Sequence, residues 1–195
     1  MNVVVIRYGA GNIQSVLFAL RRIGINPVLS SEPEVISKAD KVIFPGVGEA
    51  SSTMKELKSS GLDTVIKELK QPFLGICLGL QLMCKHSEEG DVDCLGIFNL
   101  KVKKFAPSSV YKVPHVGWNN IEQSEGPLFK GIPENSYVYY VHSFHAEIGK
   151  ETCAKTNYIN PFSASLSKDN FYAVQFHPEK SGTTGETTLQ NFISL

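Results

Sequence analysis

The sequence has no excess of charge of either sign. Its 19 lysine and arginine residues balance 19 aspartate and glutamate residues, so the formal net charge at pH 7 is +0. Nucleic acids and anionic membranes both attract strongly basic surfaces. The charge balance therefore argues against either of them as the main partner of this chain.

Long hydrophobic runs are also missing. The apolar stretch from Val3 to Ile6 is far shorter than the roughly 20 residues that cross a bilayer. Arg7 follows it at once, so the start lacks the basic and then apolar plan of a secretion signal, and we expect a cytoplasmic protein. Without repeats, low-complexity tracts or linkers, a single domain over 1–195 is expected, long enough to bury a substantial core.

Cysteine is sparse and forms no C-x-x-C pair. The four cysteines are Cys77, Cys84, Cys94 and Cys153. In a cytoplasmic chain of this length they are expected to be reduced thiols and not a disulfide framework. A zinc site is not expected, because the spacing of the residues that could form one matches no usual pattern; these are Cys84, Cys94, His142 and His145.

Strand-like and helix-like segments alternate in the first half of the chain. The strands are expected at 3–6, 26–30, 41–48 (running into a glycine loop) and 72–76. The helices are expected at 13–23, 32–39, 53–70 (broken near Ser60 and Gly61) and 78–85. This rhythm predicts a parallel sheet with helices on both faces.

From Leu95 onward the pattern changes to short strands and turns. The strand-like segments are 96–105, 115–121, 136–144, 162–166 and 171–179, and a closing helix is expected at 187–195. A mixed sheet with an antiparallel edge would absorb these strands. The predicted fold class is therefore α/β, with an open, mixed, mostly parallel sheet flanked by helices.

The stretch "GICLG" places Cys77 between two glycines, after a strand and before a helix. This pattern is typical of a nucleophile elbow with cysteine in place of serine. The elbow residue has a strained backbone, and a Cβ atom two positions away would crowd the turn. A helix that begins just after the sulfur favours thiolate, the attacking species. The alternative is a core cysteine in a glycine-rich strand end.

A nucleophilic cysteine needs a base, and the base needs an orienting group. In "QFHPEK" the side chains of His177 and Glu179 point to the same side of an extended segment, with Pro178 stiffening the backbone between them. Glu179 can then hold one imidazole nitrogen while the other faces the thiol. A surface turn is the alternative for this segment when it is taken alone.

Acyl transfer also needs hydrogen-bond donors for the oxyanion. The backbone N–H of Leu78, directly after Cys77, is one candidate. The loop "FPGVG" leaves a neighbouring strand in the same direction, so Val47 or Gly48 is the candidate for the second donor. A phosphate-binding role for this loop is the alternative, but the lysine and serine that end a P-loop are missing.

Three segments, "PGVG", "GICLGLQLM" and "QFHPEKS", resemble in this order the class I (triad) glutamine amidotransferases, whose fold is flavodoxin-like. The segments "YGAGNIQSV", "VPHVGWNNI" and "YYVHSFHAE" narrow the resemblance to the family of glutaminase subunits of imidazole glycerol phosphate synthases. The resemblance covers nearly the full chain.

The resemblance implies roles for individual residues. Cys77 would attack the glutamine carboxamide, His177 would move the proton and Glu179 would orient His177. The amino-acid end of glutamine would be held by Gln81 and Ser143, and the loop from Gly46 to Gly48 would contact the substrate and supply oxyanion donors. Neither a cofactor nor a metal is implied. We assign His115, His142 and His145 to structural hydrogen bonding, because one base already completes the triad.

The resemblance also implies a partner. Ammonia would pass to a (β/α)8-barrel synthase subunit in a heterodimer, which makes imidazole glycerol phosphate and aminoimidazole carboxamide ribotide in histidine biosynthesis. The expected interface residues are Asn12, Trp118 and Lys180, although Trp118 could equally be an ordinary core residue. Arg7 and Phe144 depart from the usual aspartate and tyrosine of the family. The alternatives are a glutaminase that serves amidation of a surface-sugar precursor, and a non-catalytic binding module.

Overall fold

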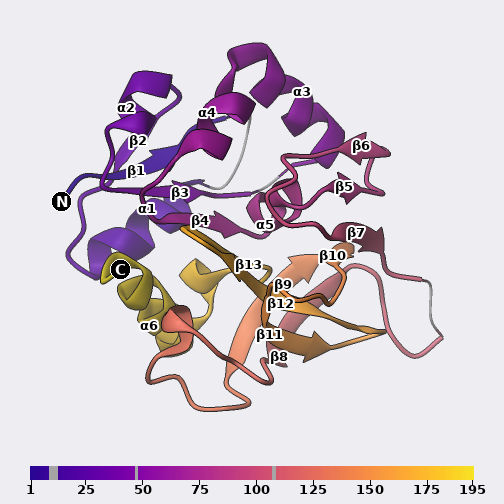
Figure 1. The fold of residues 1–195 in the computed structure, drawn as a ribbon. Coiled ribbons are helices and arrows are strands. Elements are labelled where there is room, and N and C mark those ends of the chain that lie inside the picture. Colours follow the sequence, from indigo (N-terminus) through magenta and orange to yellow (C-terminus); the bar gives the residue numbers. More distant parts are fainter. Residues whose placement is uncertain (9–12, 47, 107–108) are drawn as a thin grey trace.

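The structure is a computed structural model that describes residues 1–8, 13–46, 48–106 and 109–195 (Figure 1). Its helices are α1 (Ile13–Arg22), α2 (Pro33–Ser37), α3 (Ala50–Ser60), α4 (Leu62–Glu68), α5 (Leu78–Met83) and α6 (Gly182–Ile193), with short 3₁₀ helices η1 (Pro127–Phe129) and η2 (Pro178–Lys180). Its strands are β1 (Val3–Ile6), β2 (Val28–Ser30), β3 (Lys41–Phe44), β4 (Phe73–Ile76), β5 (His86–Ser87), β6 (Val92–Asp93), β7 (Lys101–Lys104), β8 (His115–Asn120), β9 (Tyr137–His142), β10 (Phe144–Ala146), β11 (Thr152–Asn157), β12 (Pro161–Lys168) and β13 (Phe171–Val174).

A central sheet organises the described residues. Its seven strands run in the order β11-β12-β13-β4-β3-β1-β2. The strands from β13 to β2 are parallel to one another, whereas β12 and β11 add an antiparallel edge. The strand order reverses at β1 and β3, and open α/β sheets bind ligands beyond the carboxyl ends of such strands. This arrangement confirms the predicted α/β class.

Helices cover both faces of this sheet because its inner strands are apolar on both sides. In β1, Val4 and Ile6 pack into one cluster with α2, α3, α4 and α5. Val3 and Val5 pack into the other cluster with α1 and α6. Figure 1 shows α2, α3 and α4 above the sheet and α1 and α6 below it.

Some helix boundaries differ from the sequence prediction, and for α3 the cause is local. Helix α3 begins at Ala50, earlier than expected, because the Glu49 carboxylate accepts hydrogen bonds from the N–H groups of Ser51 at 3.0 Å and Ser52 at 2.8 Å. The expected break between α3 and α4 is confirmed at Gly61, whose φ is 71°. Helix α6 begins at Gly182, five positions before the predicted start at 187.

The expectation that one mixed sheet absorbs all later strands is wrong. Among the later strands of the described residues, β11, β12 and β13 join the central sheet, β10, β7, β5 and β6 form a second sheet, and β8 and β9 form a two-stranded sheet. The β8–β9 ribbon instead packs on the sheet through Val138 and Tyr140, which are fully buried in the cluster with α1 and α6. Within the described ranges, no helix combines the length and apolar composition that a membrane span requires.

Candidate active site

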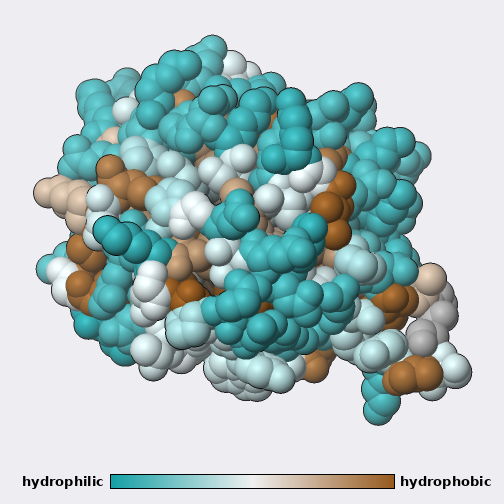
Figure 2. Space-filling model, turned by 60° about the horizontal axis from the view of Figure 1, so that its bottom comes forward, coloured by the Kyte–Doolittle hydropathy of each residue, from teal (hydrophilic) through white to brown (hydrophobic). Residues whose placement is uncertain are grey.

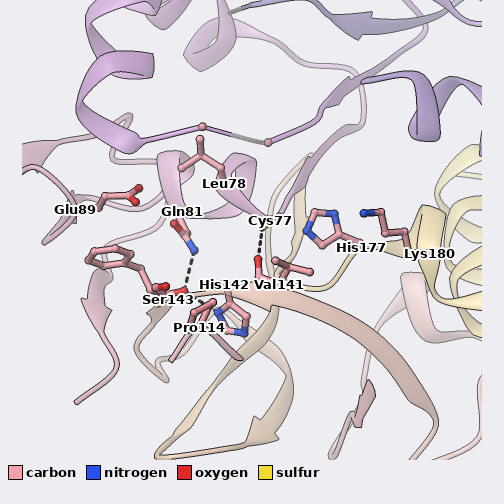
Figure 3. A pocket seen from close by; sticks show the side chains of 13 residues that line it. Cys77, Leu78, Gln81, Glu89, Pro114, Val141, His142, Ser143, His177 and Lys180 are labelled. Atoms are coloured by element: carbon pink, nitrogen blue, oxygen red, sulfur yellow. Dashed lines mark hydrogen bonds between the residues drawn. The ribbon is translucent and has the colours of Figure 1, made fainter. Parts of the chain in front are cut away.

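The carboxyl ends of β3, β4 and β13 bring the main predicted site residues to one pocket. Cys77 follows β4, Gly46 and Gly48 follow β3, and His177 lies shortly after β13. The pocket has a volume of about 390 Å³. It is lined by Gly46, Gly48, Cys77, Leu78, Gln81, Glu89, Pro114, Val141, His142, Ser143, Phe144, His177 and Lys180 (Figure 3).

Cys77 has the strained backbone expected of an elbow residue. Its φ is 54° and its ψ is −107°, a region that residues other than glycine rarely adopt. The flanking glycines are required by close packing: a Cβ atom on Gly79 would collide with the carbonyl oxygen of Phe44, and one on Gly75 would collide with Met83 and Gly79. The glycines therefore let α5 lie directly against β3 and β4.

His177 is held between Cys77 and Glu179. Its Nδ1 atom lies 2.8 Å from Oε1 of Glu179, and its imidazole lines the same pocket as Cys77 and interacts electrostatically with the sulfur. The backbone N–H of His177 donates to the carbonyl of Tyr139 in β9 at 2.9 Å, which fixes the segment after β13. The three predicted triad residues thus meet at one place, although they come from two distant parts of the chain.

The electrostatic environment of His177 favours the imidazolium. Burial alone would lower the pKa of His177. The negative charge of the Cys77 sulfur, its hydrogen bond, and the hydrogen bond and charge of Glu179 outweigh burial and raise this pKa to about 10. The site can therefore hold a thiolate beside a charged imidazole, which is the reactive form of a cysteine nucleophile.

Two of the three predicted oxyanion residues line the pocket. Leu78 is the first residue of α5 and lines the pocket, and Gly48 lines it from the β3 side with φ 128°. Gly46 lies so close to α5 that a Cβ atom on it would collide with the N–H of Gly79. The Tyr8 hydroxyl donates to the carbonyl of Pro45, which ties the start of this loop to the end of β1. Val47 lies outside the described residues.

Gln81 and Ser143 both line the pocket, as expected for residues that contact the substrate. The Gln81 side chain is buried, and its Nε2 atom donates to the carbonyl of Phe144 at 2.8 Å. Figure 3 shows Gln81, Ser143 and Glu89 to one side of Cys77, and His177 and Lys180 to the other. An elongated substrate can therefore lie across the sulfur, with its two ends in different surroundings.

Two residues of this site were not predicted from the sequence. Glu89 lines the pocket, accepts a hydrogen bond from the N–H of Ala50 at 2.9 Å, and has a pKa raised by burial. It stands in the polar stretch "SEEGD", which carries no signal beyond a solvated turn. Gln175 is fully buried and its Nε2 atom donates to the Cys77 sulfur at 3.6 Å. Its position two residues before His177 on an alternating strand could have indicated this.

Two of the three histidines that were assigned to structural hydrogen bonding have such bonds. His142 Nδ1 lies 2.8 Å from the carbonyl oxygen of Phe144, and His115 Nδ1 lies 3.0 Å from His142 Nε2. His145 differs, because its buried Nδ1 atom has no hydrogen-bond partner among the described residues and its ring stacks on Phe105 at 4.2 Å. Burial lowers the pKa of all three rings, to about 4, 3 and 4 for His115, His142 and His145.

The predicted interface residues occupy exposed positions where the structure describes them. Trp118 in β8 is 55% exposed, which excludes the core alternative, and its ring meets Tyr139 edge-on at 5.9 Å. Lys180 places its Nζ atom 6.0 Å from the centre of the Tyr139 ring and also lines the pocket. Asn12 lies outside the described residues.

Exposed apolar side chains gather on the β8–β9 ribbon. Val116, Trp118, Tyr137 and Val141 are each at least 38% exposed. On the face shown in Figure 2, hydrophobic residues form several separate patches among hydrophilic ones. Scattered apolar residues are normal, whereas a row on one ribbon indicates a binding surface. Across the described ranges, no three His, Cys, Asp or Glu side chains are grouped so as to hold a metal ion.

Comparison with known proteins shows the family of this chain. The family described as "Glutamine amidotransferase class-I" matches residues 4–195. The imidazole glycerol phosphate synthase subunit HisH of Bacteroides thetaiotaomicron is 58% identical, with 100% of both chains covered. The protein of the same name from Yersinia pseudotuberculosis is 44% identical, again over 100% of both chains.

Solved structures show the same fold at low identity. A glutamine amidotransferase from Thermotoga maritima matches with a TM-score of 0.62 and 17% identity, over 99% of this chain and 82% of that one. The PurLQS structure from Thermotoga maritima matches with a TM-score of 0.73 and 14% identity, over 99% and 97%. The chain belongs to the class-I glutamine amidotransferase family and, within it, to the HisH group of imidazole glycerol phosphate synthase subunits.

Proposed function

We propose that this chain is the glutaminase subunit of an imidazole glycerol phosphate synthase and hydrolyses glutamine to glutamate and ammonia. The observation that carries the proposal is the pocket that Cys77 and His177 line together, with Nδ1 of this imidazole held by Glu179 at 2.8 Å. Nucleophile, base and orienting acid thus stand in the order that acyl transfer through a thioester requires.

The first half of the reaction forms a thioester. The Cys77 thiolate attacks the carboxamide carbon of glutamine, and the N–H groups of Leu78 and Gly48 stabilise the oxyanion that develops. The imidazolium of His177 gives its proton to the nitrogen of the leaving group, so that the C–N bond breaks and ammonia departs. The acyl group remains on the sulfur, and the imidazole is now neutral.

Water completes the reaction. His177 takes a proton from the water molecule as its oxygen attacks the thioester carbon. The C–S bond breaks, glutamate is released, and the thiolate and imidazolium are restored. Glu179 keeps the proton-carrying Nδ1 side of the ring fixed and stabilises its positive charge in both halves.

The amino-acid end of glutamine fits the side of the pocket that holds Gln81, Ser143 and Glu89. The Nε2 atom of Gln81 is already bonded within the protein, so its Oε1 atom is the one that can accept from the substrate ammonium. The Glu89 carboxylate supplies the opposite charge to that ammonium. Ser143 offers a hydroxyl on the same side, as Figure 3 shows.

The ammonia is used by a (β/α)8-barrel synthase subunit that binds this chain as a heterodimer. The full-length relatives are named as subunits of one synthase, which favours histidine biosynthesis over amidation of a surface sugar. The exposed apolar row on the β8–β9 ribbon offers a surface for the barrel. Lys180 lines the pocket on the side away from Gln81 and Glu89, where ammonia would leave toward the partner.

The decisive experiment mixes this chain with the barrel subunit from the same organism, glutamine and the phosphoribulosyl imidazole-carboxamide intermediate. We expect glutamine-dependent formation of imidazole glycerol phosphate. Cys77→Ala should abolish it while ammonium salts still support it, and Cys94→Ala, outside the pocket, should change little. Product formation from glutamine that survives Cys77→Ala would disprove the nucleophile. If the wild-type pair made no product, the proposed pathway would be wrong.

A further inference from the structure

The side chain of Gln175 contacts the Cys77 sulfur although no step above uses it. Its Nε2 atom donates to Sγ at 3.6 Å, and the residue is 0% exposed. The strand register explains the contact: Val174 pairs with Ile76, and the N–H of Cys77 donates to the carbonyl of Val174 at 2.8 Å. Gln175 therefore stands directly beside the elbow, at the end of the adjacent parallel strand.

The hydrogen bonds of a second glutamine fix which end of this amide faces the sulfur. Nε2 of Gln81 donates to the carbonyl of Phe144 at 2.8 Å and to Oε1 of Gln175 at 3.1 Å. A backbone carbonyl can only accept, so turning the Gln81 amide over would set two oxygens against each other. With Gln81 fixed, turning Gln175 over would oppose two NH₂ groups. An N–H donor is therefore aimed at the sulfur.

The carbonyl oxygen of Phe144, which accepts a hydrogen bond from Gln81, also accepts one from His142. The Nδ1 atom of His142 lies 2.8 Å from the oxygen of Phe144, so the oxygen accepts two hydrogen bonds. Both Nε2 hydrogens of Gln81 are used within the protein, which leaves its Oε1 atom on the pocket side for a ligand. A continuous path of hydrogen bonds thus leads from the pocket through Gln81 and Gln175 to the sulfur.

We propose that Gln175 is a catalytic residue that donates a hydrogen bond to the Cys77 thiolate, and that Gln81 is a positioning residue that couples this donor to the substrate ammonium. The inference rests on the proposed glutaminase function and deepens it. A hydrogen bond to an ionised acceptor is stronger than one to a neutral group, so this donor stabilises thiolate over thiol. It does so before attack and again when the sulfur leaves the thioester.

The path also links recognition to reactivity. An ammonium bound at Oε1 of Gln81 polarises that amide and strengthens its Nε2 donors, and Gln175 then becomes a better donor in turn. No proton is transferred along the amides. The titratable groups that line the pocket together with Cys77 are Glu89, His142, His177 and Lys180. All four are retained in each Gln175 and Gln81 variant.

The test measures how the rate of Cys77 alkylation by iodoacetamide depends on pH. Mass spectrometry of the peptide that carries Cys77 separates it from the half-buried Cys94 and Cys153. In Gln175→Met, which keeps the size and removes the donor, we expect the pH of half-maximal rate to rise by about one unit, equivalent to a tenfold loss of thiolate preference. Gln175→Glu places a negative charge beside the sulfur and should raise that pH further.

Turnover and binding separate the two glutamines. Gln175→Met should lower kcat for glutamine hydrolysis about tenfold or more and change KM less than about twofold. Gln81→Met should give a smaller shift in the alkylation profile and a clear rise in KM. Ser165→Ala is the matched control, because it removes one buried hydrogen bond, from Ser165 to the Ala173 carbonyl at 2.8 Å, without contact to Cys77. Its alkylation profile should equal that of the wild type.

An unchanged alkylation profile in Gln175→Met would overturn the inference, even if turnover fell, because a merely structural glutamine would lower activity without moving the profile. Gln175→Leu carries the test if Gln175→Met does not fold, since it also removes the donor without adding a charge. The proposed function fails separately: it is wrong if Cys77→Ala retains glutaminase activity, whatever the Gln175 variants show.

Discussion

Nδ1 of His177 lies 2.8 Å from Oε1 of Glu179, two residues further along the chain, and both side chains are at least 92% buried. The second carboxylate oxygen of Glu179 is buried and has no hydrogen-bond partner among the described residues. Among the described residues, the side-chain hydrogen bond of this carboxylate is therefore the one with the His177 imidazole. A buried acid held this way costs solvation free energy that a surface turn would not incur, which favours a catalytic over a structural role.

The first prediction concerns Glu179→Gln. The substitution keeps the size of the side chain but removes the charge that helps to raise the pKa of His177 to about 10. We expect kcat for glutamine hydrolysis to fall by at least about a hundredfold, because the imidazolium loses its stabilisation and its ring orientation. Steady-state kinetics on the complex with the barrel subunit measure this. An unchanged kcat would remove Glu179 from the triad.

The same variant tests the pH dependence of stability. His177 has a folded pKa above its ordinary value of 6.5, so its contribution to the free energy of unfolding is fully present below pH 6.5 and is lost as pH rises toward about 10. In Glu179→Gln this loss should be smaller. Urea unfolding between pH 6.5 and pH 10 measures how the free energy of unfolding of each protein depends on pH. Equal dependence in the wild type and the variant would show that Glu179 does not raise the pKa of His177.

A second prediction concerns acid. Burial lowers the pKa values of His115, His142 and His145 to about 4, 3 and 4. Below pH 6.5 these three side chains therefore bind protons in the unfolded chain but not in the folded protein. Each ring should cost up to about 2 kcal/mol of stability at pH 5 relative to pH 7. Urea unfolding at the two pH values measures the total.

His145→Phe isolates one of these contributions. The ring stacks on Phe105 at 4.2 Å and its buried Nδ1 atom has no partner in the described part of the chain, so phenylalanine loses little there. The variant should be about as stable as the wild type at pH 7 and lose less stability at pH 5. A pH dependence equal to that of the wild type would show that His145 is not held neutral by the fold.

The local motifs explain why much of the site could be predicted. The elbow at Cys77 and the pair of His177 and Glu179 each consist of a few consecutive residues. The alternation of side chains along a strand predicts to which side His177 and Glu179 point. The contact of Gln175 with Cys77 depends on the register between β13 and β4, which join residues 98 positions apart. Periodicity within one strand carries no information on such a register.

The second half of the chain was harder to predict for a related reason. Short strands such as β8 and β9 show the same alternation whether they join a large sheet or pair alone, and only tertiary packing decides between these outcomes. Glu89 was missed because the turn between β5 and β6 brings it to the pocket from a stretch with no apolar pattern. Both errors arise where nonlocal contacts determine the structure.

A third prediction concerns the elbow glycines. In Gly79→Ala the new Cβ atom would collide with the carbonyl oxygen of Phe44, a backbone atom of β3 that cannot turn away. We expect a loss of about 1–3 kcal/mol in the free energy of unfolding, from overpacking, together with lower glutaminase activity. Gly24→Ala is the comparison, because its Cβ would meet nothing within 4 Å and only its φ of 82° is unfavourable. Gly24→Ala should leave kcat unchanged, and equal activity in both variants would refute the packing argument.

The last prediction concerns the partner surface. Trp118 is 55% exposed and rests edge-on against Tyr139, so Trp118→Ala should change the melting temperature little. If the barrel subunit covers the β8–β9 ribbon, the substitution should weaken its binding by about 2–4 kcal/mol, because large aromatic side chains dominate interface energies. Ile148→Ala removes another exposed apolar side chain (41% exposed) that is not part of the ribbon and should bind like the wild type. Titration calorimetry with the barrel subunit distinguishes the outcomes: an unchanged Kd for Trp118→Ala would place the partner on another face of the molecule.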